Sequence, residues 1–373
     1  MAKTHWHYPR TAFAKSTLTL LVDGPLQGLS LFGPRRTGKT EFLTHDLAPL
    51  AEREGHRVVY ANFWQAIESP IAILLYEMDF ALRHGTVLDR VRHTAAELAP
   101  KFRVRNPIGD GEIEIDLARL RGRVPDNLLL LVDQYCERLA DEKTPTLLLF
   151  DEFQELARGG EAKPLMAALR TSLEKRKNGL VAVFTGSSQE QLRATFSPVQ
   201  APFYRFALQH DLPPLGSDFV DHQLKAYGQT FKAQIDPAEA IATFEQNERS
   251  PLLLQRWLMV RGAYVNLNAR EALERVNADL AAEFGFAEKW LQLTPLQRAV
   301  GRALAERATP LFGEVGAARI AALLNEDAPA PQRTQAALRR LVRLGLADKW
   351  DRDWRLADPL FEAWVRARPE SDF

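Results

Sequence analysis

Apolar and polar residues follow two different patterns along this chain. Up to about residue 215, short apolar or β-branched runs are separated by longer stretches whose apolar residues recur at helical spacing. Strands that alternate with helices in this way form an α/β fold, with a parallel sheet covered by helices on both faces. The predicted strands are 29–32, 56–63, 146–150, 179–185 and 203–208, and the predicted helices include 40–53, 70–84, 126–139, 163–177 and 189–195.

Two segments of this first region add to the pattern. Residues 15–23, ahead of the first strand, fit either a short helix or a strand. Residues 101–105 and 112–116 both alternate polar with apolar side chains, and the segment between them contains two glycines and a proline. That arrangement is typical of two antiparallel strands joined by a turn. We therefore expect a β-hairpin inserted at about residues 100–120.

The pattern becomes helical throughout after residue 215, which predicts a small helical lid domain. Beyond residue 291 it changes again, to helices followed by two short strands and a final helix, the order of a winged helix-turn-helix. The predicted lid helices are 218–231, 237–246, 252–265 and 269–284; the winged helix comprises helices 295–307, 317–324 and 331–344, strands 346–350 and 353–357, and helix 359–368. The predicted domains are an α/β domain at 1–215, the lid at 216–290 and the winged helix at 291–373.

Composition narrows the class of protein. Hydrophobic residues make up 46% of the 373 residues and charged residues 26%, as in ordinary soluble globular proteins. No run approaches the roughly 18 apolar residues of a membrane span, and the first residues lack the apolar segment of a secretory signal. The single cysteine, Cys136, excludes an intramolecular disulfide. We expect a cytoplasmic protein that does not associate with membranes.

Charge leaves the question of nucleic acid open. The formal net charge is zero, so DNA binding would need a local basic patch. Residues 291–368 carry 13 Lys and Arg against 9 Asp and Glu. Three of these cations, Arg339, Arg340 and Arg343, lie on the third helix among leucines. They fit a DNA-contacting helix and equally well the solvated side of a packed helix.

The candidate chemistry begins with a phosphate-binding loop between the first strand and the first long helix. The segment fits G-x-x-x-x-G-K-[ST], in which glycines let backbone N–H groups surround phosphates, the lysine reaches the β- and γ-phosphates and the hydroxyl binds Mg²⁺. A strand before the loop and a helix after it favour this interpretation over a Gly-rich turn. The loop residues are Gly33, Pro34, Arg35, Arg36, Thr37, Gly38, Lys39 and Thr40.

A pair of acids follows the strand 146–150. Asp151 and Glu152 come directly after this apolar run. In nucleotide hydrolases the first such carboxylate holds Mg²⁺ and the second polarises the attacking water. Two acids at this point also fit a solvated helix start, but the phosphate loop upstream favours the catalytic pair.

Polar residues also follow the strand 179–185. Ser187 and Ser188 lie at its tip and are candidate sensors of the γ-phosphate. A serine that caps the helix 189–195 explains the same residues almost as well.

Taken together, these motifs resemble the archaeal-type ATPases, a clade of the STAND branch related to AAA+ proteins. The resemblance rests on GPRRTGKT (33–40), LLLFDEFQEL (147–156), VAVFTGSSQE (181–190), APFYRFALQHDLPPL (201–215), ERSPLLLQRW (248–257) and DPLFEAWVR (358–366). It spans nearly the whole chain, and the order of the motifs is more specific than the first two alone.

The resemblance implies roles for individual residues. Lys39 would bind phosphate, Thr40 and Asp151 would serve Mg²⁺, and Glu152 would activate water. Ser187 matches the polar sensor, and the cofactors implied are ATP and Mg²⁺.

An arginine after the sensor strand is also implied. Arg205 matches one that acts in cis, or across a subunit interface in a homo-oligomer, as an arginine finger. An exposed structural arginine is the alternative, and Arg193 is a weaker candidate for the same role.

One departure concerns the lid. The family usually has Gly-x-Pro at the start of a lid helix, whereas Arg249-Ser250-Pro251 has no glycine at that spacing. The lid would therefore approach the nucleotide base without this glycine, although Pro251 is still placed to shape the turn.

Two classes of function fit this sequence. The first is an ATP-binding and ATP-hydrolysing switch whose winged helix passes the nucleotide state to a protein partner or to DNA. The second is a DNA-handling ATPase of the initiator or transposition-helper type, which binds duplex DNA through the winged helix. A small-molecule kinase fits less well, because Glu152 suits attack by water and much of the chain forms the lid and winged helix.

Overall fold

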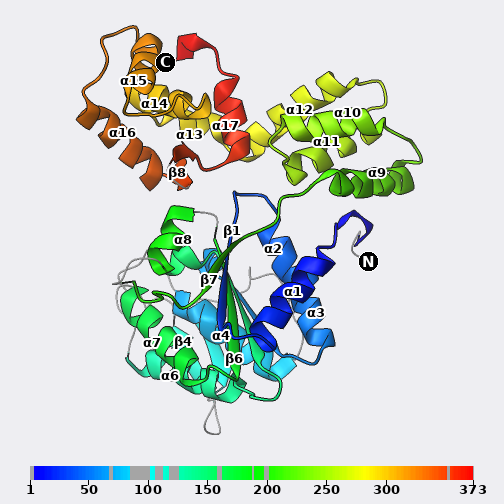
Figure 1. Ribbon diagram of the computed structural model, residues 1–373, viewed down its shortest axis with the longest axis vertical. Coiled ribbons are helices and arrows are strands. Elements are labelled where there is room, and N and C mark those ends of the chain that lie inside the picture. Colours follow the sequence, from blue (N-terminus) through cyan, green and yellow to red (C-terminus); the bar gives the residue numbers. More distant parts are fainter. Residues whose placement is uncertain are drawn as a thin grey trace.

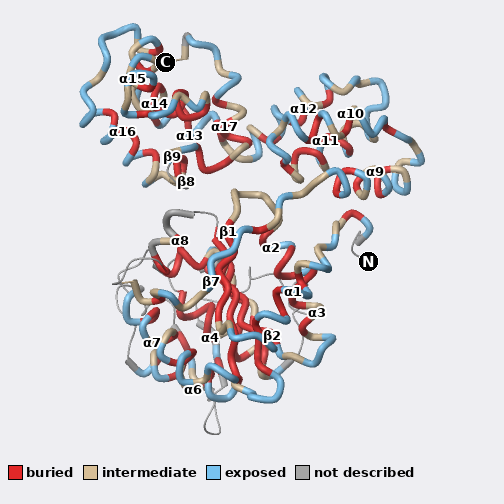
Figure 2. Tube along the Cα trace, viewed as in Figure 1, coloured by how far each residue is buried: buried red, intermediate tan, exposed pale blue. Residues whose placement is uncertain are grey.

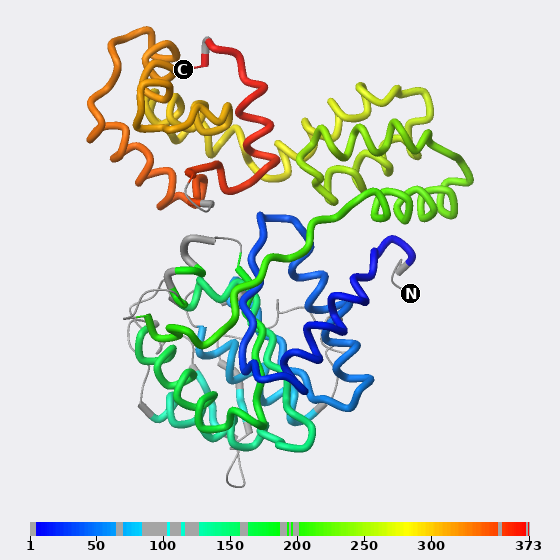
Figure 3. Tube along the Cα trace, in the orientation of Figure 1, coloured from blue at the N-terminus to red at the C-terminus, as the bar shows by residue number. Residues whose placement is uncertain are grey.

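A computed structural model describes residues 4–66, 70–84, 101–105, 112–116, 126–157, 162–186, 189–196, 201–350 and 353–372. Figure 1 shows an α/β half built around one sheet and a C-terminal half of helices with one small hairpin. A single stretch of chain after the sheet joins the two halves (Figure 3). No helix within the described ranges has the length and apolar character needed to cross a membrane.

The sheet of the α/β half has five parallel strands in the order β2-β5-β6-β1-β7. The expected fold class, a parallel-sheet α/β phosphate-loop core, is therefore confirmed. Because all five strands run in the same direction, the carboxyl ends of β1, β5 and β6 lie at one edge of the sheet. The strands are β1 (Gly28–Phe32), β2 (Val58–Asn62), β5 (Thr146–Asp151), β6 (Leu180–Thr185) and β7 (Leu208–Asp211).

The predicted fifth strand, 203–208, was wrong. Residues 201–207 form turns, and the strand β7 begins only at Leu208. The aromatic residues that favoured a strand pack instead against the core: Phe203 is fully buried, and its ring centroid lies 5.2 Å from that of Phe153. All four residues of β7 are exposed, so only backbone pairing with β1 marks it as a strand.

Helices cover both faces of the sheet, and alternate strand residues enter different cores. Along β5, Leu147 and Leu149 pack with one cluster, whereas Leu148 and Phe150 pack with the other. The buried strands stand out in Figure 2. The helical segments of this half are α1 (Thr11–Val22), α2 (Lys39–Glu41), the π-helix η2 (Phe42–Leu47), α3 (Ala48–Arg53), α4 (Pro70–His84), α6 (Asp126–Leu139), α7 (Ala162–Lys175) and α8 (Gln189–Phe196), with short 3-10 turns at Thr4–Trp6, η3 (Phe63–Ala66) and η6 (Phe153–Ala157).

The two strands of the predicted hairpin pair as expected, and the segment between them lies outside the described residues. Strands β3 (Lys101–Arg105) and β4 (Glu112–Asp116) pair in antiparallel register, with Phe102 opposite Ile115. Val104 and Ile115 are buried in one of the two cores of the sheet. The hairpin is thus anchored to the α/β half by its apolar face.

The C-terminal half follows the predicted order of helices and strands, with one additional helix, α13 (Phe286–Leu291), that was not predicted. Its buried residues form one continuous cluster, from Phe219 on the first helix to Val365 on the last. Three helices, a hairpin and a last helix make the winged helix. The elements are α9 (Ser217–Phe231), α10 (Pro237–Gln246), α11 (Pro251–Ala263), α12 (Ala269–Glu283), α13 (Phe286–Leu291), α14 (Pro295–Ala305), α15 (Glu314–Leu324), α16 (Pro331–Arg343), β8 (Ala347–Trp350), β9 (Asp353–Leu356), α17 (Pro359–Arg366) and a 3-10 turn at Glu370–Asp372.

Candidate nucleotide-binding site

The loop between β1 and α2 has the backbone that its sequence requires. Gly38 has φ 91° and stands at the N-cap of the helical segment 39–53. This left-handed conformation is easy for glycine and costly for other residues. The Thr37 hydroxyl donates to the Pro34 carbonyl at 2.9 Å, which closes the turn. The loop therefore places the N-terminus of a helix, with its partial positive charge, at the edge of the sheet where phosphate is expected.

Lys39 is buried and points back into the loop. Its Nζ donates to the carbonyl oxygens of Gly33 and Pro34, both at 2.7 Å. Burial lowers the pKa of this ammonium to about 8, and the nearby carboxylates of Glu152 and Asp151 act in the opposite direction. An anion that enters the loop would meet a cation already desolvated and held by two carbonyls.

Asp151, the last residue of β5, accepts hydrogen bonds from residues of both neighbouring strands and of the loop. Its Oδ2 accepts from the Thr40 hydroxyl at 2.7 Å and from the Tyr60 hydroxyl at 3.1 Å. Its Oδ1 accepts from the Thr185 hydroxyl at the end of β6. Because the carboxylate is only 1% exposed, these donors offset the desolvation of its charge. Burial, followed by the charge of Asp151, raises the pKa of the Tyr60 hydroxyl.

Sequence analysis identified Thr40 and Asp151 but missed Tyr60 and Thr185. A signal for them existed, because both carry hydroxyls near the carboxyl ends of strands that flank β5. The same is true of Asn62, whose amide nitrogen lies 3.5 Å from Asp151 Oδ2. Only the strand order, which the sequence does not give, shows that all three belong to one carboxylate.

Glu152 follows in a strained backbone conformation. Its φ is 53°, in the left-handed region that residues other than glycine seldom adopt. Its backbone N–H donates to Asp151 Oδ1 at 3.1 Å, and its side chain accepts a hydrogen bond from Gln154. Residues that the surrounding structure holds in a strained backbone conformation are common at functional sites.

The oxygen ligands at this edge fit a magnesium ion. Thr40 Oγ1 and Asp151 Oδ2 are already in contact, and both are the hard oxygen donors that Mg²⁺ prefers. No group of three or more His, Cys, Asp or Glu side chains able to hold a metal occurs among the residues that the structure describes. One carboxylate and one hydroxyl suit Mg²⁺ better than a metal that needs a full set of protein ligands.

The other face of the loop is held by the winged helix. Arg36, with φ 65°, donates from Nη2 to Asp358 Oδ2 at 2.9 Å and from Nη1 to Oδ1 at 3.2 Å. Its guanidinium also lies 3.6 Å from the ring centroid of Phe284, at the end of α12. The neighbouring Arg35 reaches toward Gly345, where an added Cβ would lie 3.5 Å from Arg35 Nη2. Both arginines were predicted to bind nucleotide as members of the loop, and their contacts with α12 and the winged helix were not predicted.

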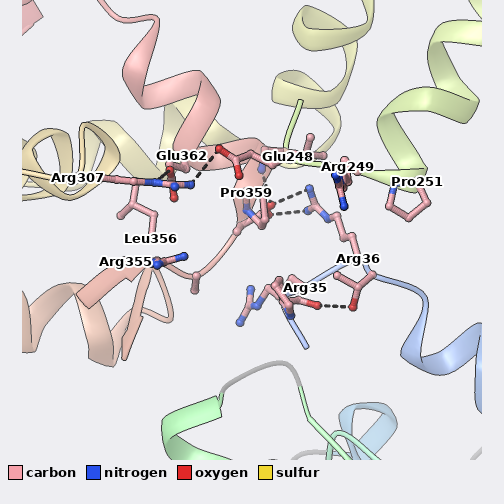
Figure 4. A pocket seen from close by; sticks show the side chains of 16 residues that line it. Arg35, Arg36, Glu248, Arg249, Pro251, Arg307, Arg355, Leu356, Pro359 and Glu362 are labelled. Carbon is pink, nitrogen blue, oxygen red and sulfur yellow. Dashed lines mark hydrogen bonds and ion pairs between the residues drawn. The ribbon is translucent and has the colours of Figure 1, made fainter. Parts of the chain in front are cut away.

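A pocket opens at this junction, between the loop, the start of α11 and the winged helix (Figure 4). Five arginines and three carboxylates line it. One of the arginines, Arg307, is paired with Glu248 at 3.0 Å and with Glu362 at 3.5 Å. The arginines are Arg35, Arg36, Arg249, Arg307 and Arg355.

The unusual start of the lid helix α11 also lines this pocket. Glu248 and Arg249 have φ of 54° and 53°, the left-handed conformation that a glycine would adopt readily. Ser250 then caps α11, accepting from Leu253 N at 3.3 Å, and Pro251 occupies the first turn. Two residues other than glycine thus adopt a left-handed backbone conformation beside the phosphate loop.

The N-terminal segment joins the loop to the lid helices. Arg10 donates to the Thr37 carbonyl at 3.1 Å, and His7 Nε2 lies 2.7 Å from Asp46 Oδ1 on the helix that follows the loop. On the other side, His5 bonds Thr230 of α9 at 3.0 Å. The hydrogen bond with Asp46 is the main reason why the pKa of His7 is raised.

Solved structures match the fold of this chain over nearly its full length. A Walker-type ATPase of Pyrococcus abyssi is 18% identical, with 97% of this chain and 99% of that chain covered and a TM-score of 0.65. This chain has the fold of that Walker-type ATPase. The ORC2 protein of Aeropyrum pernix also matches, in its ADP form (16% identity, 96% of this chain and 94% of that chain, TM-score 0.51) and in ADPNP–ADP complexes (17%, 95% and 90%, 0.53). No protein-family model and no curated protein sequence matches the chain.

The remaining predicted residues are the candidate sensor serines and the candidate arginine fingers. Ser187 and Ser188 lie outside the described residues. Arg205 is exposed, with φ 54°, and its guanidinium lies 5.1 Å from the ring centroid of Tyr204. The structure does not bring it to the phosphate loop. Arg193 lies closer, with its guanidinium 5.5 Å from the ring centroid of Phe32, the residue before the loop.

Proposed function

We propose that this protein is an ATP-binding and ATP-hydrolysing switch. In this proposal the loop amides and Lys39 bind the phosphates, and Thr40 and Asp151 hold Mg²⁺, which neutralises charge on the phosphate oxygens when bound. Glu152 accepts the proton of the attacking water. The fold of a Walker-type ATPase and the contact between Thr40 and Asp151 support these assignments. The soluble composition and single cysteine are in keeping with action in the cytoplasm.

The observation that carries the switch function is the ion pair between Arg36 and Asp358. It joins the phosphate loop directly to the first turn of α17 in the winged helix, through side chains that are 22% and 12% exposed. The output element therefore touches the nucleotide-binding element itself. A ligand shifts a two-state equilibrium only through contacts that differ between the states, and in this proposal the ion pair is formed in one state and broken in the other.

The loop offers a route for that shift. Lys39 is bonded to the carbonyls of Gly33 and Pro34, so turning its donors toward phosphate alters the backbone that presents Arg36. Added negative charge also competes with Asp358 for the same guanidinium. In the proposed cycle, ATP weakens the contact between loop and winged helix, and hydrolysis with release restores it.

The first test measures phosphate release and ATP affinity of the purified full-length chain with Mg²⁺. We expect saturable ATP binding and turnover, with binding lost in Lys39→Ala and retained in Lys163→Ala, an exposed lysine of α7. Absence of nucleotide binding by the wild-type protein would refute the proposal. Binding without turnover, even after addition of DNA, would limit the protein to a non-hydrolysing switch.

A second candidate function is handling of duplex DNA through the winged helix. It is favoured by the face of α16, where the arginines are exposed while Leu338 and Leu341 are buried. A salt titration of duplex binding tests it, because phosphate contacts make affinity fall steeply with salt. The variant to compare carries Ala at Arg339, Arg340 and Arg343, and its control carries Ala at the exposed Arg270 and Arg275. Failure to bind duplex at low ionic strength would eliminate this function.

A further inference from the structure

A buried glutamine contacts the predicted catalytic base. Gln154 lies in the 3-10 turn η6 after β5 and is 1% exposed. Its Nε2 donates to Glu152 Oε2 at 2.5 Å and lies 3.5 Å from Glu155 Oε1. One neutral amide therefore lies between two carboxylates, with its short bond to Glu152.

The end of the neighbouring strand leaves room for this amide. A Cβ added at Gly186, directly after β6, would lie 2.3 Å from Gln154 Oε1. The backbone of Gly186 is not in the left-handed region, so conformational freedom does not account for this glycine. Space for Gln154 does. The side chain thus spans from the acid after β5 to the tip of β6, where the predicted sensor begins.

The backbone of Glu152 adds to this arrangement. With φ 53° and its N–H bonded to Asp151 Oδ1, the residue turns sharply away from β5. Such a turn fixes the start of the side chain but leaves its outer torsions free to rotate. A donor at the carboxylate end is what fixes the rest.

We propose that Gln154 is a positioning residue: its amide holds the Glu152 carboxylate in the orientation from which it accepts the proton of the attacking water. This inference rests on the proposed ATPase function. In the step, water oxygen bonds to the terminal phosphorus, the bond to the leaving ADP breaks, and the water proton passes to Glu152. Gln154 neither gains nor loses a proton.

Gln154→Leu tests the role, because leucine has a similar size and no donor. A hydrogen bond to a residue that itself contacts the reacting groups is worth about 10- to 100-fold in activity. We therefore expect kcat to fall by that factor with ATP affinity unchanged. Gln154→Asn keeps an amide donor, one methylene shorter, and should recover part of kcat. A loss of packing alone would leave this smaller side chain no better than leucine.

A second variant reaches the same bond without changing Gln154. In Gly186→Ala the new methyl displaces the amide oxygen, so kcat should fall with ATP affinity unchanged. The matched control is Gln27→Leu. Gln27 donates to the Leu173 carbonyl at 2.5 Å and the Leu180 carbonyl at 3.5 Å, the same two lengths, at the opposite end of the sheet. This control should keep wild-type kcat.

A readout without nucleotide is thermal unfolding. Gln154→Leu should melt below the wild type, because two neighbouring carboxylates lose the amide that lies between them. If Gln154→Leu does not fold, Gly186→Ala and Gln154→Asn, whose amide is one methylene shorter, supply the kinetic comparison.

The outcomes separate this inference from the function on which it rests. A wild-type protein that does not hydrolyse ATP refutes the ATPase function and this role with it. Active wild type together with unchanged kcat in both Gln154→Leu and Gly186→Ala overturns the positioning role alone. An equal loss of ATP affinity and kcat would also overturn it, because Gln154 would then act in binding.

Discussion

The two faces of the phosphate loop differ in what holds them. The hydrogen bonds of the inner face, from Lys39 and Thr40, go to the loop itself and to Asp151. On the outer face, Arg36 contacts the end of α12 and the winged helix, and Arg35 lies near Gly345 of the winged helix and the Trp64 ring. The inner residues occupy the specified positions of the motif, and the outer ones occupy its variable positions. Within one loop, the motif thus predicts the chemistry, while the unspecified residues connect that chemistry to the rest of the molecule.

The largest expected effect isolates chemistry at the inner face. Glu152→Gln keeps the size of the side chain and removes the proton acceptor, so kcat should fall about 1,000-fold. ATP affinity should stay within about twofold of wild type, a difference of less than 1 kcal/mol. Parallel measurements of turnover and equilibrium binding check this. Equal losses in both would show that Glu152 belongs to binding.

Lys39→Ala should affect binding instead. Removing a buried cation that bonds phosphate costs about 2 to 5 kcal/mol, or roughly 30- to 5,000-fold in ATP affinity. The winged helix should stay docked in this variant, because Arg36 and Asp358 are untouched. An ATP titration, with Lys163→Ala as control, measures the loss. Affinity that survives would place the phosphates elsewhere.

The pKa of Lys39 predicts a pH dependence of ATP binding. Since burial lowers that pKa to about 8 in the free protein, the lysine loses its charge as pH rises through this value. ATP affinity should therefore be constant from about pH 6.5 to 7.5 and fall above pH 8, approaching a tenfold loss per pH unit. Titrations across this range test the expectation. The dependence should be absent in Lys39→Ala.

Asp358→Asn sharpens the comparison at the outer face. Asparagine keeps the N-cap of α17, where Asp358 Oδ1 accepts from Leu360 N at 3.0 Å, but it loses the charge that holds Arg36. The free protein then has a weaker contact between the loop and the winged helix to break when ATP binds, so ATP affinity should rise about three- to tenfold. Asp236→Asn is the control, because it caps α10 at the same 3.0 Å with no contact to the loop. Unchanged affinity in Asp358→Asn would mean that the ion pair is not coupled to nucleotide.

The smallest effect concerns the N-terminal segment. The raised pKa of His7 means that its bond to Asp46 stabilises the fold fully below pH 6.5, and this contribution is lost as pH rises through the raised value. His7→Ala should therefore lower the melting temperature more at pH 6 than at pH 8.5. A contribution of about 1 kcal/mol is typical of such a bond. Equal shifts at both pH values would contradict the assignment.

Much of the fold is predictable because buried positions appear in the sequence as apolar runs or as apolar residues at regular spacing. The strands β1, β5 and β6 are fully buried, and each appears as an apolar run followed by the residues of a motif. The strand β7 has no such apolar run, since its residues are exposed and only its backbone is paired. The aromatic residues ahead of it indicated burial correctly but the wrong backbone conformation.

The candidate site is predictable to the extent that its residues are adjacent in sequence. The loop and the acids after β5 are local motifs. Tyr60 and Thr185 meet Asp151 only through the strand order, and the partner of Arg36 lies 322 residues away. The bond between Gln154 and Glu152 is local, yet the room for it depends on Gly186 of another strand. These contacts arise from tertiary packing, which periodicity does not encode.

The central claim is that nucleotide weakens the contact between the loop and the winged helix. Spin labels at Lys163→Cys on α7 and Arg333→Cys on α16, both exposed positions, report the distance between the two halves, and the native Cys136 is buried. In a Glu152→Gln background, we predict that saturating ATP shifts this distance distribution and that Asp358→Asn shifts part of it without nucleotide. A distribution that does not change with ATP bound would contradict the account.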